Sequence, residues 1–200
     1  MDDSRFIRFA GWCAYLSAAM TVLGLVTLMI FFALISQQGI GNIWGPINDA
    51  TSVILALTNI VLLVALHRLY RSVASMTSLV AVIVGVAAML VAAVMQSLLI
   101  LKVIAFAATA VAVPAAFGVF GAALIVYCLL ARRAAAWSKR LVWFGILAGA
   151  GYVLTIVGWI ACGTQSPIIY VGGLLAVICV TVLAIGFGRM LLSAKETISR

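Results

Sequence analysis

The segment Gln37–Ser52, with the sequence QQGIGNIWGPINDATS, is the one long polar interruption in an otherwise apolar chain. Its three glycines and Pro46 are residues that favour turns. Its Asp49 is one of only four acidic residues in the chain. Long apolar runs flank the segment on both sides. We therefore expect a loop here, between two membrane-spanning helices.

The composition predicts that the rest of the chain is embedded in a membrane. Of its 200 residues, 67% are hydrophobic and 8% are charged, whereas a soluble domain has about 25% charged residues. A bilayer core about 30 Å thick requires roughly 20 apolar residues per helix. We expect an all-α transmembrane bundle of six helices, forming a single domain over residues 1–200. The helices are predicted at about residues 9–36, 49–66, 77–101, 108–131, 141–161 and 168–192.

Two features of the apolar runs bear on these boundaries. The first run is longer than the roughly 7–15 residues of a signal-peptide core, so we expect it to remain as a helix. Pro114 interrupts the fourth run, and proline lacks the N–H that a helix interior uses. The fourth helix therefore either begins near Val113 or continues through a kink at Pro114, and we expect a start between Lys102 and Val113.

The basic residues predict the orientation. Eleven of the twelve lie near the termini or in the loops that follow the second and fourth predicted helices, and only Lys102 lies on the opposite side of the membrane. The eleven are Arg5, Arg8, Arg68, Arg71, Arg132, Arg133, Lys139, Arg140, Arg189, Lys195 and Arg200. Because basic residues concentrate on the cytoplasmic side, we expect both termini to be cytoplasmic, in a bacterial inner (plasma) membrane. The polar segment then faces outward.

The net charge of +8 is explained by this topology and does not require a nucleic acid. The basic residues lie in short clusters between helices, the pattern of contact with anionic lipid headgroups. The densest cluster encloses the sequence AAAWS and consists of Arg132, Arg133, Lys139 and Arg140. We expect these four residues to bind headgroups on the cytoplasmic face of the bilayer.

Polar side chains within the helices suggest an outward-facing cleft. Asn48, Ser52 and Asn59 share one face of the second helix, and Asn59 is expected near the bilayer midplane. Gln96 lies at an intermediate depth on the third helix, and buried amides require partners. The predicted cleft is covered by the polar segment and lined by Asn48, Asp49, Ser52, Asn59, Gln96, Lys102 and Trp159. The alternative is that the amides only hydrogen-bond neighbouring helices together.

Asp49 and Lys102 are the only charged residues predicted on the outer side. Charges near hydrocarbon are usually paired, so an ion pair between them is one interpretation. The other interpretation is that each is solvated, or that Asp49 stabilises the beginning of the second helix as a cap.

Known catalytic and metal-binding patterns are not found. The single histidine, His67, is predicted at the inner membrane interface, on the side opposite Asp49. The four cysteines lack CxxC spacing and are interpreted as buried apolar thiols. We therefore expect no metal and no cofactor. Small residues at close spacing, in particular Gly145 and Gly149, predict tight helix contacts.

The sequence WGPINDATSVILALTNIVLLVALHRLYR, residues 44–71, resembles the second-helix region of a family of small bacterial membrane proteins of unknown function. Gly45, Pro46, Asp49, His67 and Arg68 carry the resemblance. It implies a six-helix membrane protein and supplies no activity.

These observations favour a non-enzymatic membrane protein whose cleft binds or passes a small or lipid-like ligand. An accessory subunit of a larger membrane complex is the alternative, and self-association is compatible with either. An intramembrane enzyme acting on lipid is less favoured, because no acid–base pair is evident.

Overall fold

The computed structural model of the chain describes residues 3–34, 41–163 and 166–198 and contains six α-helices. They are α1 (Asp3–Leu34), α2 (Gly41–Tyr70), α3 (Ser75–Ile100), α4 (Phe106–Arg133), α5 (Lys139–Cys162) and α6 (Pro167–Ile198). The described residues contain no strand. All six helices are long and apolar enough to cross a membrane. The predicted all-α membrane bundle is confirmed.

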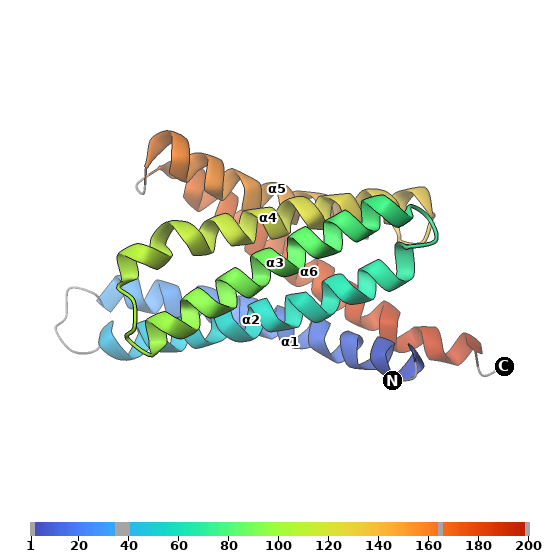
Figure 1. Cartoon of the computed structure of the whole chain (residues 1–200), viewed down its shortest axis with the longest axis horizontal. Helices are drawn as coiled ribbons and strands as arrows, with labels where there is room; N and C mark the ends of the chain where they lie inside the picture. The colour runs from blue at the N-terminus through green and yellow to red at the C-terminus, as the bar shows by residue number, and fades with distance from the viewer. Residues whose placement is uncertain (1–2, 35–40, 164–165, 199–200) are drawn as a thin grey trace.

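The helices form a ring in chain order. Each helix packs against the next, and α1 packs against α6 to close the ring. Within the described ranges, α2 and α4 are the only pair that touch across it. Both termini and the short loops 71–74 and 134–138 lie at one end, which we call the basic end (Figure 1). The loop 101–105 lies at the opposite end, the far end (Figure 1).

The polar segment is helical where the structure describes it. Because α2 begins at Gly41, residues 41–52 form its first three turns and not a loop. Pro46 lies inside the helix, near its beginning. Pro46 is the sixth residue of the helix, so it lies beyond the first four N–H groups, which have no partner within a helix, and its missing N–H costs one backbone hydrogen bond. Residues 37–40, the remainder of the expected loop and cover, lie outside the described residues.

The structure also decides whether the fourth helix begins at Pro114 or continues through it. Helix α4 begins at Phe106, within the expected interval, and continues through Pro114. The interpretation in which Pro114 starts the helix is therefore wrong. Helix α6 likewise extends beyond its predicted end at 192 to Ile198. Apolar patterning reports the part of a helix that meets hydrocarbon, whereas backbone hydrogen bonding continues into the polar interface.

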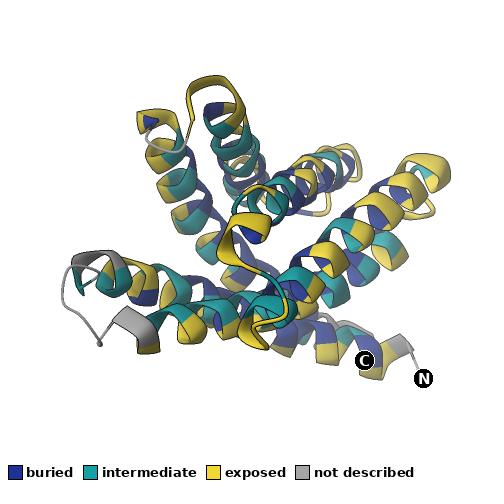
Figure 2. Cartoon of the chain, turned by 60° about the vertical axis from the view of Figure 1, so that its left-hand side comes forward, coloured by how far each residue is buried: buried dark blue, intermediate teal, exposed yellow. Residues whose placement is uncertain are grey.

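Buried residues follow the seams between helices, and exposed residues lie on the outside (Figure 2). Many of the exposed residues are large and apolar. The tightest seams are between α4, α5 and α6. A Cβ added at Gly121 on α4 would lie 2.7 Å from the Gly149 carbonyl oxygen on α5. A Cβ added at Gly151 on α5 would lie 2.6 Å from the Gly172 carbonyl oxygen on α6. A Cβ added at Gly145 would collide with Cys128 Sγ on α4, and one added at Gly149 would collide with the Gly121 carbonyl oxygen. The predicted close helix contacts at Gly145 and Gly149 are therefore confirmed.

Candidate functional site

A polar seam runs between α1 and α2. At mid-bundle, Ser17 Oγ of α1 donates a hydrogen bond of 3.0 Å to Asn59 Oδ1 of α2. Nearer the far end, Thr27 Oγ1 lies 3.3 Å from Asn48 Oδ1. Ser17, Thr27 and Asn59 are each about 1% exposed. The two helices are thus joined by side-chain hydrogen bonds inside an apolar bundle.

The α1 side of this seam was not predicted from the sequence. Ser17, Thr21, Gly24 and Thr27 recur at intervals of three or four residues, so they form one helical stripe. Thr21 Oγ1 also donates to the Ser17 carbonyl oxygen at 2.8 Å. Such back-bonding satisfies a hydroxyl in hydrocarbon. The spacing of small hydroxyl residues was the available signal, and it is inconspicuous because each residue is only weakly polar.

A groove of about 200 Å³ opens beside the seam towards the far end. One wall comes from α1 and α2 and carries the hydroxyl and amide side chains of Thr21, Asn48, Thr51 and Ser52 among apolar side chains such as Leu25 and Leu55. The other wall is apolar and aromatic and includes residues of α4, α5 and α6, namely Phe117, Tyr152 and Val177. Among the described residues, no charged side chain lines this groove. The groove therefore suits an uncharged molecule with one polar and one apolar side.

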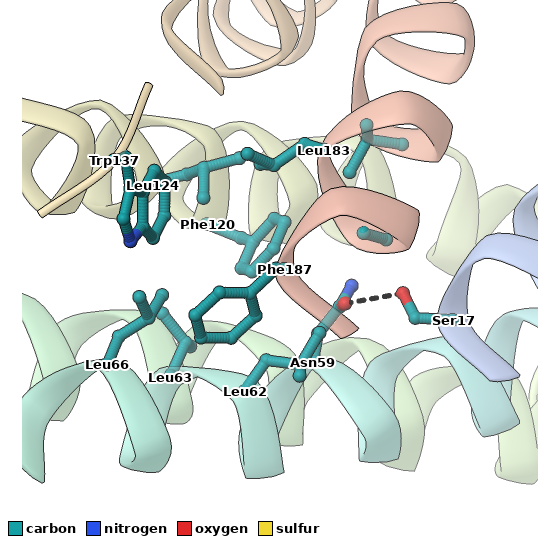
Figure 3. A pocket seen from close by; sticks show the side chains of 12 residues that line it. Ser17, Asn59, Leu62, Leu63, Leu66, Phe120, Leu124, Trp137, Leu183 and Phe187 are labelled. Atoms are coloured by element: carbon teal, nitrogen blue, oxygen red, sulfur yellow. Dashed lines mark hydrogen bonds between the residues drawn. The ribbon is translucent and has the colours of Figure 1, made fainter. Parts of the chain in front are cut away.

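A second, narrower cavity of about 30 Å³ lies in the centre of the ring. Figure 3 shows Ser17 and Asn59 at one side of it, Trp137 at the other and Phe187 between them. The remaining lining is apolar, from α2, α4 and α6. Asn59 Nδ2 and Trp137 Nε1 are buried and have no hydrogen-bond partner among the described residues. Two residues with an unpaired donor thus line an otherwise apolar cavity.

The structure brings some of the predicted cleft residues together. Asn48 and Ser52 line the groove, and Asn59 lines the central cavity. Asn59 lies close to the middle of the candidate membrane span Ile43–Tyr70, as expected. Asp49 is half-buried on α2 and is not among the groove-lining residues.

Gln96 lies at the level of the groove but on another seam. Gly85 on α3 packs against Leu63 on α2, since a Cβ added at Gly85 would lie 2.8 Å from Leu63 Cδ1. Gln96 is eleven residues after Gly85 and Ser52 is eleven residues before Leu63, so the antiparallel helices place them at one height. Gln96 is buried, its Oε1 has no partner among the described residues, and it lines neither cavity.

Three further predictions concern the far end. Lys102 is exposed in the loop 101–105, and its φ of 57° is left-handed. Among the described residues, no ion pair joins it to Asp49. Since α2 begins eight residues before Asp49, Asp49 is not in the first turn, and the helix-cap alternative is wrong. Trp159 is half-buried near the end of α5 and does not line the groove.

The basic end carries the predicted cationic cluster. Arg132, Arg133, Lys139 and Arg140 are all exposed, on both sides of the loop 134–138. A pocket of about 420 Å³ lies here, and Arg132, Trp137 and Lys139 are among its lining residues.

His67 makes an interhelical contact that sequence reasoning missed. His67 Nδ1 lies 2.9 Å from Ser78 Oγ on α3. The hydroxyl of Tyr127 on α4 donates to the Ser78 carbonyl oxygen at 2.8 Å. These contacts connect α2, α3 and α4, so His67 stabilises the ring at this end. The described part of the chain holds no group of three side chains suited to a metal ion.

Comparison with protein-family models, curated proteins and solved structures finds no match for the chain.

Proposed function

We propose that this protein is a non-enzymatic integral membrane protein that binds a small, uncharged amphiphile in the groove beside the α1–α2 seam. The observation that carries the proposal is that the α1–α2 wall of the groove holds hydroxyl and amide side chains, whereas the opposite wall is apolar and aromatic. Ligand sites are typically mostly apolar, with a few polar groups that fix orientation. Hydroxyl and amide groups of the ligand would face Thr21, Asn48 and Ser52, while its apolar part would pack on Phe117 and Tyr152.

The proposal is tested by filling the groove. Ser52 Oγ bonds only within its own helix, to the Asn48 carbonyl oxygen at 3.0 Å, so Ser52→Leu adds bulk without breaking an interhelical bond. We expect the variant, purified in mild detergent, to retain about tenfold less of the copurifying compound than the wild type, equivalent to about 1.4 kcal/mol. Mass spectrometry of the extracted small molecules measures this.

The matched control is Ala50→Leu, which adds the same side chain to an exposed position two residues away on α2. It should retain the compound like the wild type. Equal retention by Ser52→Leu would contradict the proposal. So would a wild-type protein that carries no compound above the level found with an unrelated membrane protein.

We further propose that the basic end faces the cytoplasm of a bacterial cell and that the groove opens outward. The distribution of Arg and Lys supports this orientation. Cys162 tests it, because it is exposed at the far end whereas Cys13, Cys128 and Cys179 are buried. A membrane-impermeant maleimide should label intact cells, and Cys162→Ala should abolish the labelling. Labelling that requires permeabilised cells would reverse the orientation.

The accessory-subunit alternative has no comparable support. Exposed large apolar side chains occur on all six helices, as contact with lipid requires, and they do not single out one face for a partner.

A further inference from the structure

The groove and the central cavity lie in line along the axis of the ring. On four helices, the last residue of the groove and the first residue of the cavity are three or four positions apart. The pairs are Met20 and Ser17 on α1, Leu55 and Asn59 on α2, Phe117 and Phe120 on α4, and Val177 and Val180 on α6. Since one helical turn rises about 5.4 Å, a single layer of side chains separates the two spaces.

An aromatic cluster forms this layer. The ring of Tyr152, which lines the groove, stacks on Phe117 with centroids 5.7 Å apart. It also meets Phe120, which lines the cavity, edge-on at 5.8 Å. The Tyr152 backbone is held on the tight α4–α5 seam, because an added Cβ at Gly121 would lie 2.6 Å from Tyr152 Cβ. The Tyr152 cluster therefore lies between the groove and the central cavity.

Trp137 closes the other end of the cavity. Its side chain lines both the central cavity and the pocket at the basic end. Its ring packs between Tyr70, at a centroid distance of 6.2 Å, and Phe187, at 5.5 Å. Trp137 belongs to the short loop 134–138, so one loop side chain separates the cavity from the basic end.

We propose that the groove, the central cavity and the basic-end pocket are successive parts of one passage for a small uncharged solute with a hydrogen-bond acceptor oxygen. The Tyr152 cluster and Trp137 close the two ends of the central cavity. The proposal rests on the proposed function, because the groove is the outer mouth of this passage.

The central cavity determines the class of solute. The Asn59 side chain is 1% exposed and carries the unpaired donor Nδ2. The hydrogen bond that Ser17 donates to Asn59 Oδ1 orients the amide (Figure 3). An acceptor oxygen of the solute satisfies this donor, whose unpaired burial is otherwise costly. The described residues place no charged side chain in this cavity, so an ion would lose its hydration there at a far larger cost. At about 30 Å³, the space suits a solute of few atoms, since a water requires about 10–15 Å³.

The test measures solute flux in vesicles of phosphatidylethanolamine and phosphatidylglycerol that contain the full chain. Stopped-flow light scattering reports the entry of glycerol or urea, and parallel samples report the entry of chloride or nitrate. We expect wild-type protein to admit at least one of the uncharged probes faster than protein-free vesicles and to admit neither anion. Asn59→Leu should reduce the flux about fivefold, as expected for loss of one hydrogen bond.

Tyr152→Ala tests the passage independently if Asn59→Leu disturbs folding. It should raise the flux severalfold by removing the aromatic layer. Its matched control is Tyr170→Ala, at a position on α6 that is 64% exposed, which should leave the flux unchanged. Uncharged-probe flux equal to that of protein-free vesicles would overturn the passage, as would selective anion flux or equal effects of the two tyrosine variants.

The two proposals fail separately. Retention of a compound that depends on Ser52, without flux, would leave the groove site standing and overturn the passage. Flux that depends on Asn59 and Tyr152, without a retained compound, would support the passage and contradict tight binding in the groove.

Discussion

The α4–α5 and α1–α2 seams join neighbouring helices in opposite ways. Between α4 and α5, Gly121 and Gly149 bring the backbones so close that neither position has room for a Cβ. Between α1 and α2, Gly24 is the counterpart, and a Cβ there would meet Thr51 Oγ1 at an ordinary 3.4 Å. The α1–α2 contact depends instead on hydroxyl and amide side chains such as Ser17 and Asn59.

The difference shows where the ring is adapted for binding. Lipid offers no hydrophobic driving force for helix association, so close packing of small residues provides much of the stability. The α4–α5 seam is of this type. The α1–α2 seam keeps polar groups in hydrocarbon, one of them unpaired, beside two cavities. Polar groups buried at such a cost mark functional sites in membrane proteins.

The largest effect is expected at the glycine seam. Gly149→Ala would force its Cβ against the Gly121 carbonyl oxygen and against Ile125 Cγ1, 2.6 Å away. Backbone cannot yield as a side-chain tip does, so we expect a loss of about 3 kcal/mol in the free energy of unfolding. Titration with sodium dodecyl sulfate from mild-detergent micelles, followed by tryptophan fluorescence, measures it.

Gly173→Ala on α6 is the matched control, because an added Cβ there meets nothing within 4 Å. It should leave the stability unchanged or raise it slightly through helix propensity. Similar losses in the two variants would show that the α4–α5 seam has no special role.

A smaller effect of opposite sign is expected at the polar seam. Asn59→Leu removes the hydrogen bond from Ser17, worth about 0.6 kcal/mol in membranes. It also removes the unpaired Nδ2 donor, whose burial costs about 1–3 kcal/mol. The variant should therefore be more stable than the wild type by about 1 kcal/mol in the same titration, while losing flux. Stabilisation with loss of function is typical of functional sites.

Thr58→Val controls for the removal of a buried polar group from α2. The Thr58 hydroxyl is within hydrogen-bond distance of the Ile54 carbonyl oxygen of its own helix, at 3.0 Å, so its loss should change stability little. If Asn59→Leu proved destabilising, Asn59 would be interhelical glue, and the two seams would differ only in the type of contact.

Much of the architecture could be predicted because membrane insertion depends on local composition. Apolar runs gave six helices, and the small residues Gly145 and Gly149 correctly marked a close seam. The polar segment was wrongly predicted as a loop because Pro46 and the glycines favour turns locally. The helix instead accommodates Pro46 near its beginning, with the loss of one backbone hydrogen bond.

For the candidate site, the sequence identified Asn48, Ser52 and Asn59 as polar residues on one face of α2, because helical periodicity depends on a single segment. The sequence could not show that Ser17 is the partner of Asn59 or that Gln96 is not. It also gave no indication that Trp137 reaches the central cavity. Only the tertiary structure decided these relations, because they depend on how a ring of helices aligns residues that are far apart in the chain.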